Sequence, residues 1–314
     1  MKLKKILVII PMTKEQKERL EQILPDAEYV YTSSSEVTKE QIQQAKIILG
    51  SVPPDMIQAS ENLAWIHLDS AGYNLYVEDD VLSPHTILTT SSGAYGKAVS
   101  EHMFAMLLSL QKKLYLYRDN QRKHLWADEG EVTSITDSTI LLLGAGDIGN
   151  HFARLSHALG AYVIGIKRTL SECPPYMDEL HTMDKLKDLL PKADVVISFL
   201  PSTDKTRGLF HKELFNTMKP GSFFLNGGRG DLVCTEDLCD ALESGHLAGA
   251  AMDVTEPEPL PENHRLWEIP NAIITPHISG YYHLPETLRN VVNICLENVK
   301  RYADGEALRN VVKH

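Results

Sequence analysis

Cysteine is scarce in this sequence. Four cysteines occur among 314 residues, and no two of them form a C-x-x-C pair or a zinc-finger spacing. This pattern supports neither a disulfide framework nor a structural zinc site. It favours reduced thiols, and we therefore expect a cytoplasmic protein without a bound metal.

Long apolar runs and an excess of basic charge are also missing. The apolar run at 6–10 follows three lysines but is only five residues long, which is too short for the core of a signal peptide. No stretch approaches the roughly 20 apolar residues of a membrane span. The formal net charge is −11, so we expect no binding to nucleic acid or to an anionic membrane.

Strand-like and helix-like stretches alternate along the chain. This order predicts an α/β protein with parallel sheets covered by helices, and the length suggests about two domains. The first set of predicted strands is 5–10, 27–31, 46–49, 63–68 and 86–89. The second set is 139–143, 162–166, 194–199, 222–225, 248–252 and 272–275. Six strands is the number expected of a full dinucleotide-binding sheet.

A long helical stretch, 97–126, separates the two sets. It is apolar on several faces, so it needs more than one partner surface, either the two domains or a second subunit. The last 30 residues predict a helix and an apolar tail, 308–312, that returns to the first domain. We therefore expect one domain at 1–96 plus 283–314, and a second at 97–282 that includes the connecting helix.

A glycine-rich loop follows the first strand of the second set. Gly144, Gly146 and Gly149 form a G-x-G-x-x-G that opens a helical stretch. The first glycine permits a tight turn, the second lets a pyrophosphate approach the backbone, and the third lets helix and strand pack closely. Asp147 and Ile148 would begin the helix, whose free N–H groups bind an anion. The pattern predicts a dinucleotide site.

The next strand ends in a basic pair. Lys167, Arg168 and Thr169 occupy the place where NAD-preferring sites usually carry Asp or Glu. A guanidinium binds the 2′-phosphate of NADP with paired, charge-assisted hydrogen bonds. We therefore predict that NADP(H) is preferred over NAD(H). The alternative is that Lys167 and Arg168 are ordinary solvated charges.

Three further segments follow predicted strands. They are Asn-Gly-Gly-Arg-Gly at 226–230, Asp-Val-Thr-Glu-Pro-Glu-Pro at 253–259 and Thr-Pro-His-Ile at 275–278. Ligands of doubly wound sheets bind at the carboxyl ends of the strands. The three segments should therefore converge on the same edge as the glycine loop.

With these motifs, the whole chain resembles the D-isomer-specific 2-hydroxyacid dehydrogenases. It is most like the NADPH-using glyoxylate/hydroxypyruvate reductases and is also similar to short phosphoglycerate dehydrogenase-like proteins. The resemblance implies two doubly wound parallel-sheet domains, with a Rossmann cofactor domain inserted into a flavodoxin-like substrate domain. It implies a homodimer that transfers a hydride between NAD(P)H and a small 2-oxo acid to give a D-2-hydroxy acid.

The resemblance also implies roles for individual residues. Arg229 would hold the carboxylate and carbonyl of the substrate, and His277 would donate the proton. Glu258 would orient and charge the imidazole, with Glu256 as a competitor for that role. Asp253 would contact the nicotinamide amide.

Two weaker segments complete the implied site. Backbone N–H groups around Ser70, Ala71 and Gly72 would bind the substrate carboxylate, although a plain turn is the alternative reading. Ser279 stands where many members of the family have glycine. The cofactor is also expected to meet Leu200, Pro201, Ser202, Thr206, Gly228 and Ser279.

The proposed chemistry needs these residue types. Hydride addition to a 2-oxo acid puts negative charge on the carbonyl oxygen, which a protonated imidazole neutralises by donating a proton. A carboxylate beside the ring favours its charged form, and an arginine matches a carboxylate bidentately.

Two other functions remain open. One is an NAD-linked D-2-hydroxy acid or phosphoglycerate-type dehydrogenase, although no room is left after residue 314 for the regulatory serine-binding domain of longer phosphoglycerate dehydrogenases. The other is a nicotinamide-sensing, corepressor-like binding protein. The proton-donating set Arg229, Glu258 and His277 argues against the latter, because a sensor does not need it.

Overall fold

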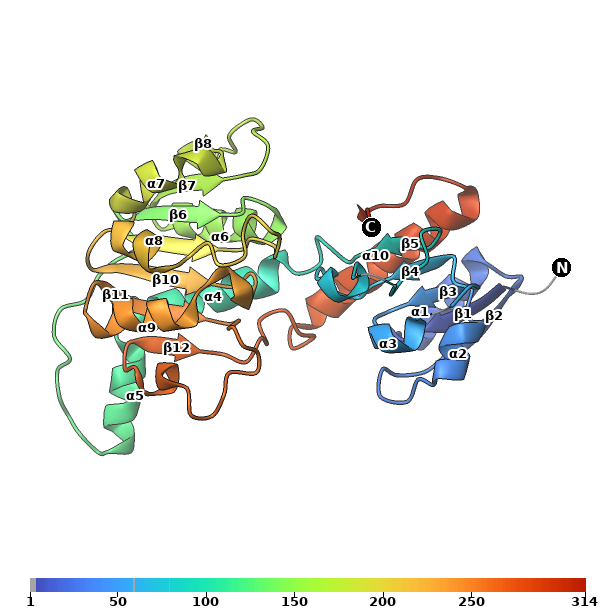
Figure 1. The fold of residues 1–314 in the computed structure, drawn as a ribbon, viewed down its shortest axis with the longest axis horizontal. Helices are drawn as coiled ribbons and strands as arrows, with labels where there is room; N and C mark the ends of the chain where they lie inside the picture. The colour runs from blue at the N-terminus through green and yellow to red at the C-terminus, as the bar shows by residue number, and fades with distance from the viewer. Residues whose placement is uncertain (1–3, 59, 79) are drawn as a thin grey trace. The chain divides into compact units, whose positions relative to one another are not determined.

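The structure is a computed structural model that describes residues 4–58, 60–78 and 80–314. The chain forms two compact units (Figure 1). Unit 1 combines the described residues up to Tyr95 with Tyr282–His314, and unit 2 is Gly96–Tyr281. Each unit has its own sheet covered by helices, which confirms the predicted fold class. None of the helices in the described ranges has both the length and the apolar character needed to cross a bilayer.

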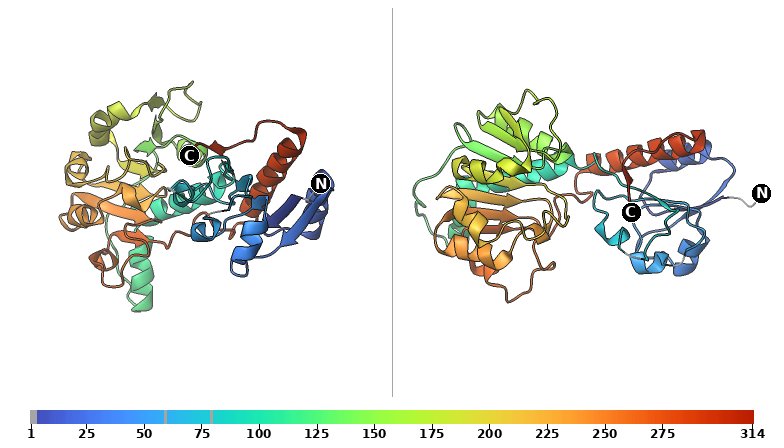
Figure 2. Two further views of the ribbon diagram at one scale, coloured as in Figure 1. Left: turned by 45° about the vertical axis from the view of Figure 1, so that its right-hand side comes forward. Right: turned by 45° about the horizontal axis from the view of Figure 1, so that its top comes forward.

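Unit 1 is a six-stranded sheet with the order β13-β5-β4-β3-β1-β2. Its five parallel strands follow the flavodoxin-like order 2-1-3-4-5. In the right-hand view of Figure 2, α1 and α10 lie side by side on one face, with α2 and α3 on the other. The elements are β1 Lys4–Val8, α1 Lys14–Ile23, β2 Ala27–Tyr31, α2 Lys39–Gln44, β3 Ile47–Leu49, α3 Pro54–Ile57, β4 Trp65–His67, η1 Asn74–Tyr76, β5 Ile87–Thr89, α10 Pro285–Asp304 and β13 Val311–Val312.

Local sequence signals explain several of these boundaries. Thr38 and Gln41 form a capping box at the start of α2, which satisfies two backbone N–H groups at the helix terminus. Pro54 is the first residue of α3. The apolar tail does return to unit 1, where β13 pairs antiparallel with β5 through Val311 and Thr89.

Unit 2 is a seven-stranded, all-parallel sheet with the order β12-β11-β10-β9-β6-β7-β8. Its first six strands have the Rossmann order 3-2-1-4-5-6. Its elements are α4 Gly96–Gln111, α5 Leu114–Arg122, β6 Thr139–Leu143, α6 Asp147–Ala158, β7 Tyr162–Ile166, β8 Glu179–His181, η2 Met183–Lys185, α7 Leu186–Leu189, η3 Leu190–Lys192, β9 Val195–Ser198, α8 Lys212–Thr217, β10 Ser222–Asn226, η4 Gly230–Leu232, α9 Thr235–Glu243, β11 Leu247–Met252, η5 Arg265–Glu268 and β12 Ala272–Ile274.

The prediction of six strands for this sheet was wrong because it missed β8. This strand is only three residues long and half-buried, and two of its residues are Glu179 and His181. It therefore lacks the apolar run by which strands are recognised. It pairs with β7 in register, with His181 opposite Ile166.

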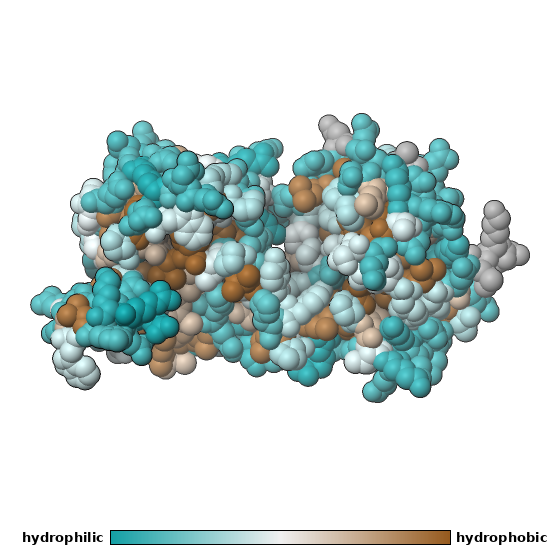
Figure 3. All heavy atoms as spheres, turned by 90° about the horizontal axis from the view of Figure 1, so that it is seen from below, coloured by the Kyte–Doolittle hydropathy of each residue, from teal (hydrophilic) through white to brown (hydrophobic). Residues whose placement is uncertain are grey.

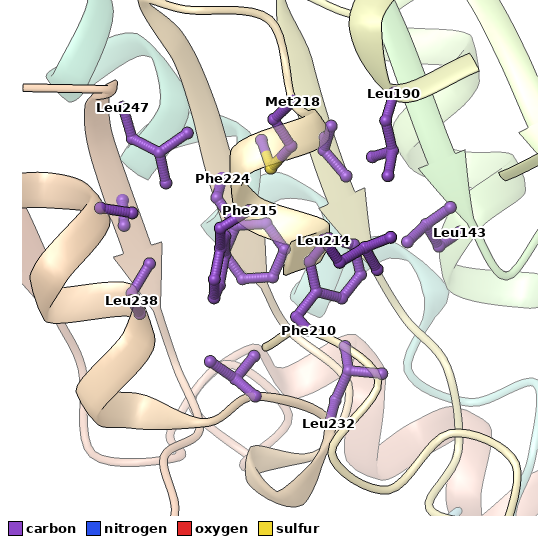
Figure 4. Packing of buried hydrophobic residues seen from close by; sticks show 14 of the residues in the cluster. Leu143, Leu190, Phe210, Leu214, Phe215, Met218, Phe224, Leu232, Leu238 and Leu247 are labelled. Carbon is purple, nitrogen blue, oxygen red and sulfur yellow. The ribbon is translucent and has the colours of Figure 1, made fainter. Parts of the chain in front are cut away.

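A large apolar core fixes the sheet of unit 2. Helices α7, α8 and α9 bury their apolar residues against one face of the sheet (Figure 4). The rings of Phe210 and Phe224 lie 4.7 Å apart between centroids, and Phe215 meets both. Burying each such ring contributes roughly 1.5–3 kcal/mol. The sheet is therefore a firm support for the loops at its edge.

The single long helix predicted for 97–126 is two helices. Helix α4 ends at Gln111, and Lys113 takes a left-handed conformation (φ 54°) before α5 begins. Helix α5 ends at Arg122 because His124 is also left-handed (φ 53°). The Leu125 N–H then donates back to the Asn120 carbonyl at 2.9 Å. This is a Schellman cap, which usually carries glycine, so the end of the helix at a histidine is hard to predict from sequence.

Candidate active site

The carboxyl ends of six strands of unit 2 lie in one row. The sheet pairs, in order, Ile166, Leu143, Ser198, Asn226, Met252 and Ile274. The chain leaves the sheet one residue beyond this row, at 144, 167, 199, 227, 253 and 275, and the chemistry-bearing segments lie at these exits. Strand register therefore brings the glycine loop, the basic pair and the three other segments to one edge of the sheet.

The glycine loop has the shape of a phosphate cradle. Gly144 is left-handed (φ +99°), and a Cβ on Gly149 would lie 2.3 Å from the Gly144 oxygen. A Cβ on Gly146 would meet nothing within 4 Å, and no side chain caps the start of α6. The first N–H groups of α6, at Asp147 and Ile148, are therefore open to an anion. These residues fit the pyrophosphate of a dinucleotide.

The basic pair begins directly beside this loop. The N–H groups of Gly144 and Ala145 both donate to the Ile166 oxygen at 3.0 Å. Lys167 Nζ donates to Ser171 Oγ at 3.2 Å. Arg168 is exposed, and within 4–58, 60–78 and 80–314 its guanidinium has no hydrogen-bond or ion-pair partner. Thr169 is exposed as well.

The segment from Leu200 lies against the loop that carries Arg229. A Cβ on Gly228 would be 2.6 Å from the Leu200 oxygen, so only glycine permits this approach. Thr206 is buried, and its hydroxyl donates to the Pro201 oxygen at 2.7 Å. Ser202 donates to the carboxylate of Asp231. The residues predicted to contact the cofactor in this segment, and Gly228, therefore lie on two loops that pack against each other.

The Arg229 loop is fixed by its own backbone contacts. The buried Asn226 amide donates to the Arg229 oxygen at 2.8 Å and accepts from the Gly228 N–H at 3.1 Å. A Cβ on Gly230 would lie 1.8 Å from the Thr255 oxygen. This loop therefore packs directly against the segment that carries Glu258. Arg229 Nη1 also donates to the Gly228 oxygen at 2.8 Å.

His277 and Glu258 are joined by a hydrogen bond. His277 Nδ1 lies 2.6 Å from Glu258 Oε1, and the two side chains are 43 % and 42 % exposed. The other ring nitrogen, Nε2, is thereby turned away from the carboxylate. Glu256, the competing carboxylate, instead accepts a hydrogen bond from Thr235 Oγ1 at its backbone oxygen. Of the two glutamates, Glu258 is the one whose carboxylate bonds the ring.

His277 has a strained backbone. Its φ is +52°, in the left-handed region, which a non-glycine residue occupies only when its surroundings impose it. The His277 N–H donates to the Asp253 oxygen at 2.7 Å and to the Thr275 oxygen at 3.0 Å. Such strain is typical of functional positions, because it fixes where a side chain points.

Asp253 organises the turn that presents His277. It is 1 % exposed. One oxygen accepts from Thr275 Oγ1 at 2.6 Å and from the Ile278 N–H at 3.1 Å. The other accepts from the Ser279 N–H at 3.2 Å and from the Ser279 hydroxyl. These four bonds fill the acceptor sites of a carboxylate, so a contact to the nicotinamide would have to share one of them.

His102, which no sequence motif singles out, lies in this cluster. His102 Nε2 lies 3.0 Å from Thr275 Oγ1 and 3.8 Å from Asp253 Oδ1. Met106, one helical turn further along α4, also contacts Thr275. The helical spacing could have indicated that His102 faces the buried side of α4. It lies one turn after Val99 and one turn before Met106, and both of these residues are buried.

The predicted substrate turn lies in unit 1, after β4. The carbonyls of Leu68 and Ser70 accept from the hydroxyl and the N–H of Ser91, at 2.9 and 3.0 Å. The Gly72 carbonyl accepts from Ser70 Oγ at 2.6 Å. The N–H groups of Ser70, Ala71 and Gly72 have no partner among the described residues. Such a turn offers N–H groups to an anion.

Comparison with known proteins identifies relatives of this chain. Residues 104–279 match the D-isomer specific 2-hydroxyacid dehydrogenase, NAD binding domain. A glyoxylate/hydroxypyruvate reductase A of Photorhabdus laumondii is 29 % identical over 83 % of this chain and 83 % of its own length.

Two solved structures are similar over nearly the whole chain. One is a D-isomer specific 2-hydroxyacid dehydrogenase family protein of Aeromonas salmonicida, with 31 % identity, a TM-score of 0.86 and 98 % of each chain covered. The other, from Xanthobacter autotrophicus, is a complex with NADPH and MES. It has 25 % identity and a TM-score of 0.81, covering 99 % of this chain and 98 % of the other. The chain therefore belongs to the D-isomer specific 2-hydroxyacid dehydrogenases, a family of NAD(P)-dependent enzymes.

Proposed function

We propose that this enzyme uses NADPH to reduce a small 2-oxo acid, of the glyoxylate or hydroxypyruvate type, to the D-2-hydroxy acid. The observation that carries the proposal is the His277–Glu258 hydrogen bond of 2.6 Å. It lies at the sheet edge where strand register also brings the glycine loop. A proton donor and a dinucleotide cradle on one edge are what a reductase of this kind requires.

Each residue has a defined task in the proposed reaction. The reduced nicotinamide, when bound, supplies the hydride. His277 donates a proton from Nε2 to the carbonyl oxygen, where negative charge develops. Glu258, bonded to Nδ1, fixes the orientation of the ring. Arg229 binds the substrate carboxylate. Within unit 1, the open N–H groups of the Ser70–Gly72 turn are a second group of donors suited to a carboxylate.

The contacts to the cofactor are proposed in the same way. The glycine loop and the start of α6 would hold the pyrophosphate, and the loops at 200–206 and 228 would line the adenosine side. Ser279 and Asp253 would face the nicotinamide amide. The exposed guanidinium of Arg168 has no partner among the described residues, which leaves it available for a 2′-phosphate.

The substrate class is inferred from the relatives. The proposed site recognises a carboxylate and an adjacent carbonyl, which every 2-oxo acid offers. The Photorhabdus protein bears the name glyoxylate/hydroxypyruvate reductase A, and we therefore expect the shortest acids to react best.

The test is a panel of glyoxylate, hydroxypyruvate, pyruvate and longer 2-oxo acids, each assayed with NADPH and with NADH by loss of reduced-nicotinamide absorbance. We expect the highest kcat/KM for glyoxylate or hydroxypyruvate with NADPH. Absence of turnover with every acid would reject the proposal.

The preference for NADPH is tested with Arg168→Ala. This variant should raise KM for NADPH about tenfold or more, because a charge-assisted pair with the 2′-phosphate is lost, and it should leave KM for NADH unchanged.

We also propose that the protein is a cytoplasmic homodimer whose copies meet at α5 and the segment after it. Its exposed apolar residues are Leu114, Tyr117, Leu125, Trp126 and Val132. The Trp126 indole is fully exposed, which is costly for an isolated chain and typical of an interface. Figure 3, viewed from the side on which α5 projects in Figure 1, shows scattered apolar areas in brown on a mainly hydrophilic surface. Sedimentation equilibrium should give twice the mass of one chain, and Trp126→Glu should lower it; a monomeric wild type would refute the dimer.

A further inference from the structure

Asp69 binds three other segments of unit 1. It lies just after β4 and immediately before the Ser70–Gly72 turn. Its Oδ1 accepts from the N–H and the hydroxyl of Ser51 at 3.0 and 2.5 Å. Its Oδ2 accepts from the Tyr282 hydroxyl at 2.7 Å, and its backbone carbonyl accepts from the Tyr95 hydroxyl. The residue before the turn is therefore held from both its side chain and its backbone.

The two tyrosines occupy special places in the chain. Tyr95 is the last residue of the first segment of unit 1, and Tyr282 is the first residue of the second. Burial, and then the negative charge of Asp69, raises the pKa of both phenols. Each hydroxyl therefore stays protonated and keeps donating at any pH at which the protein works. The bonds tie the turn to the two points where the chain enters and leaves unit 1.

The charge of Asp69 makes these bonds important for an anionic substrate. A carboxylate beside a turn that offers N–H groups would bind those groups itself unless other donors engage its oxygens. Here Ser51 engages one oxygen and Tyr282 the other. The negative charge is thus held by donors of its own, and the N–H groups of Ser70, Ala71 and Gly72 are left for a ligand.

We propose that Asp69, held by Tyr95 and Tyr282, is a positioning residue that sets the Ser70–Gly72 turn for the substrate carboxylate. The inference rests on the proposed function of that turn. We expect the Tyr282 hydroxyl to affect the affinity for the substrate. The affinity for the cofactor should not depend on it, because the glycine loop belongs to unit 2.

The first test is steady-state kinetics of Tyr282→Phe. Loss of one hydrogen bond to a charged group should raise KM for the oxo acid about tenfold, while kcat and the Kd of NADPH stay unchanged. Asp69→Asn should act in the same direction, and the double variant should be little worse than Asp69→Asn alone because both changes remove one interaction. Tyr302→Phe is the control, since this tyrosine of α10 stacks on Trp65 at 5.2 Å and does not touch the turn.

The second test is hydrogen–deuterium exchange of peptides covering 68–76. We expect faster exchange in Tyr282→Phe, and in Tyr95→Phe should the former not fold, with no change in Tyr302→Phe. Unchanged KM and unchanged exchange in the tyrosine variants would overturn the inference. If the wild type reduces no 2-oxo acid, the proposed function is wrong. The exchange comparison then still shows whether Asp69 and its two tyrosines order the turn.

Discussion

Replacing His277 with alanine is expected to lower kcat for 2-oxo acid reduction by about 10²–10⁴-fold, the usual contribution of a general acid. The side chain that bonds Glu258 at 2.6 Å is then gone, and no proton donor neutralises the developing alkoxide. The Kd of NADPH, measured by fluorescence of the reduced nicotinamide, should not change, because the glycine loop is untouched. Near wild-type turnover would show that another group donates the proton.

The left-handed backbone of His277 calls for a second variant. Alanine tolerates a φ of +52° poorly, so part of any loss in His277→Ala could come from a displaced turn. Asparagine adopts this conformation several-fold more readily than most residues and cannot donate an imidazolium proton. Equal losses of kcat in His277→Ala and His277→Asn assign the effect to the missing acid; recovery in the asparagine variant assigns it to the backbone.

The partner of His277 is tested by a variant of its own. Glu258 holds the imidazole through the 2.6 Å bond to Nδ1, and Glu258→Gln should lower kcat about tenfold because a charge-assisted hydrogen bond becomes a neutral one. Glu256→Gln is the matched control and should leave kcat unchanged, because the bond to His277 Nδ1 comes from Glu258. An unchanged kcat in Glu258→Gln would remove Glu258 from the role.

The elements with a strong local pattern were predictable from sequence. The strand at 139–143 and the one at 162–166 have the predicted bounds, because each is an apolar run closed by glycine or polar residues. Their parallel pairing then follows from the alternation of strands and helices. The meeting of Glu258 with His277 was foreseen only through resemblance, since it depends on the register of β11 with β12.

What the sequence did not reveal depends on contacts between distant segments. The contact of His102 with Thr275 joins residues far apart in the chain, and a lone histidine on a helix gives no sign of its partner. The break at Lys113 and the cap at His124 put non-glycine residues in left-handed conformations, against their intrinsic preference. Asp69 reads as an ordinary turn residue until Tyr95 and Tyr282 are placed beside it.

Replacing Arg229 with alanine should lower kcat/KM by about 10²–10³-fold. A bidentate guanidinium–carboxylate pair contributes roughly 2–5 kcal/mol when one partner is removed, and about 1.4 kcal/mol corresponds to tenfold. The loop itself should keep its shape, because the bonds that fix it come from Asn226 and from the backbone packing at Gly230. Circular dichroism and the Kd of NADPH are therefore expected to stay as in the wild type.

Arg229→Lys separates charge from geometry. Lysine keeps the positive charge but offers no planar fork, so we expect kcat/KM to fall between the wild type and Arg229→Ala. The sharpest measurement compares a 2-oxo acid with a ketone of the same length that lacks the carboxylate. In the wild type the acid should be strongly preferred, and in Arg229→Ala that preference should fall by about the same factor as kcat/KM. An undiminished preference in Arg229→Ala would show that Arg229 does not bind the carboxylate.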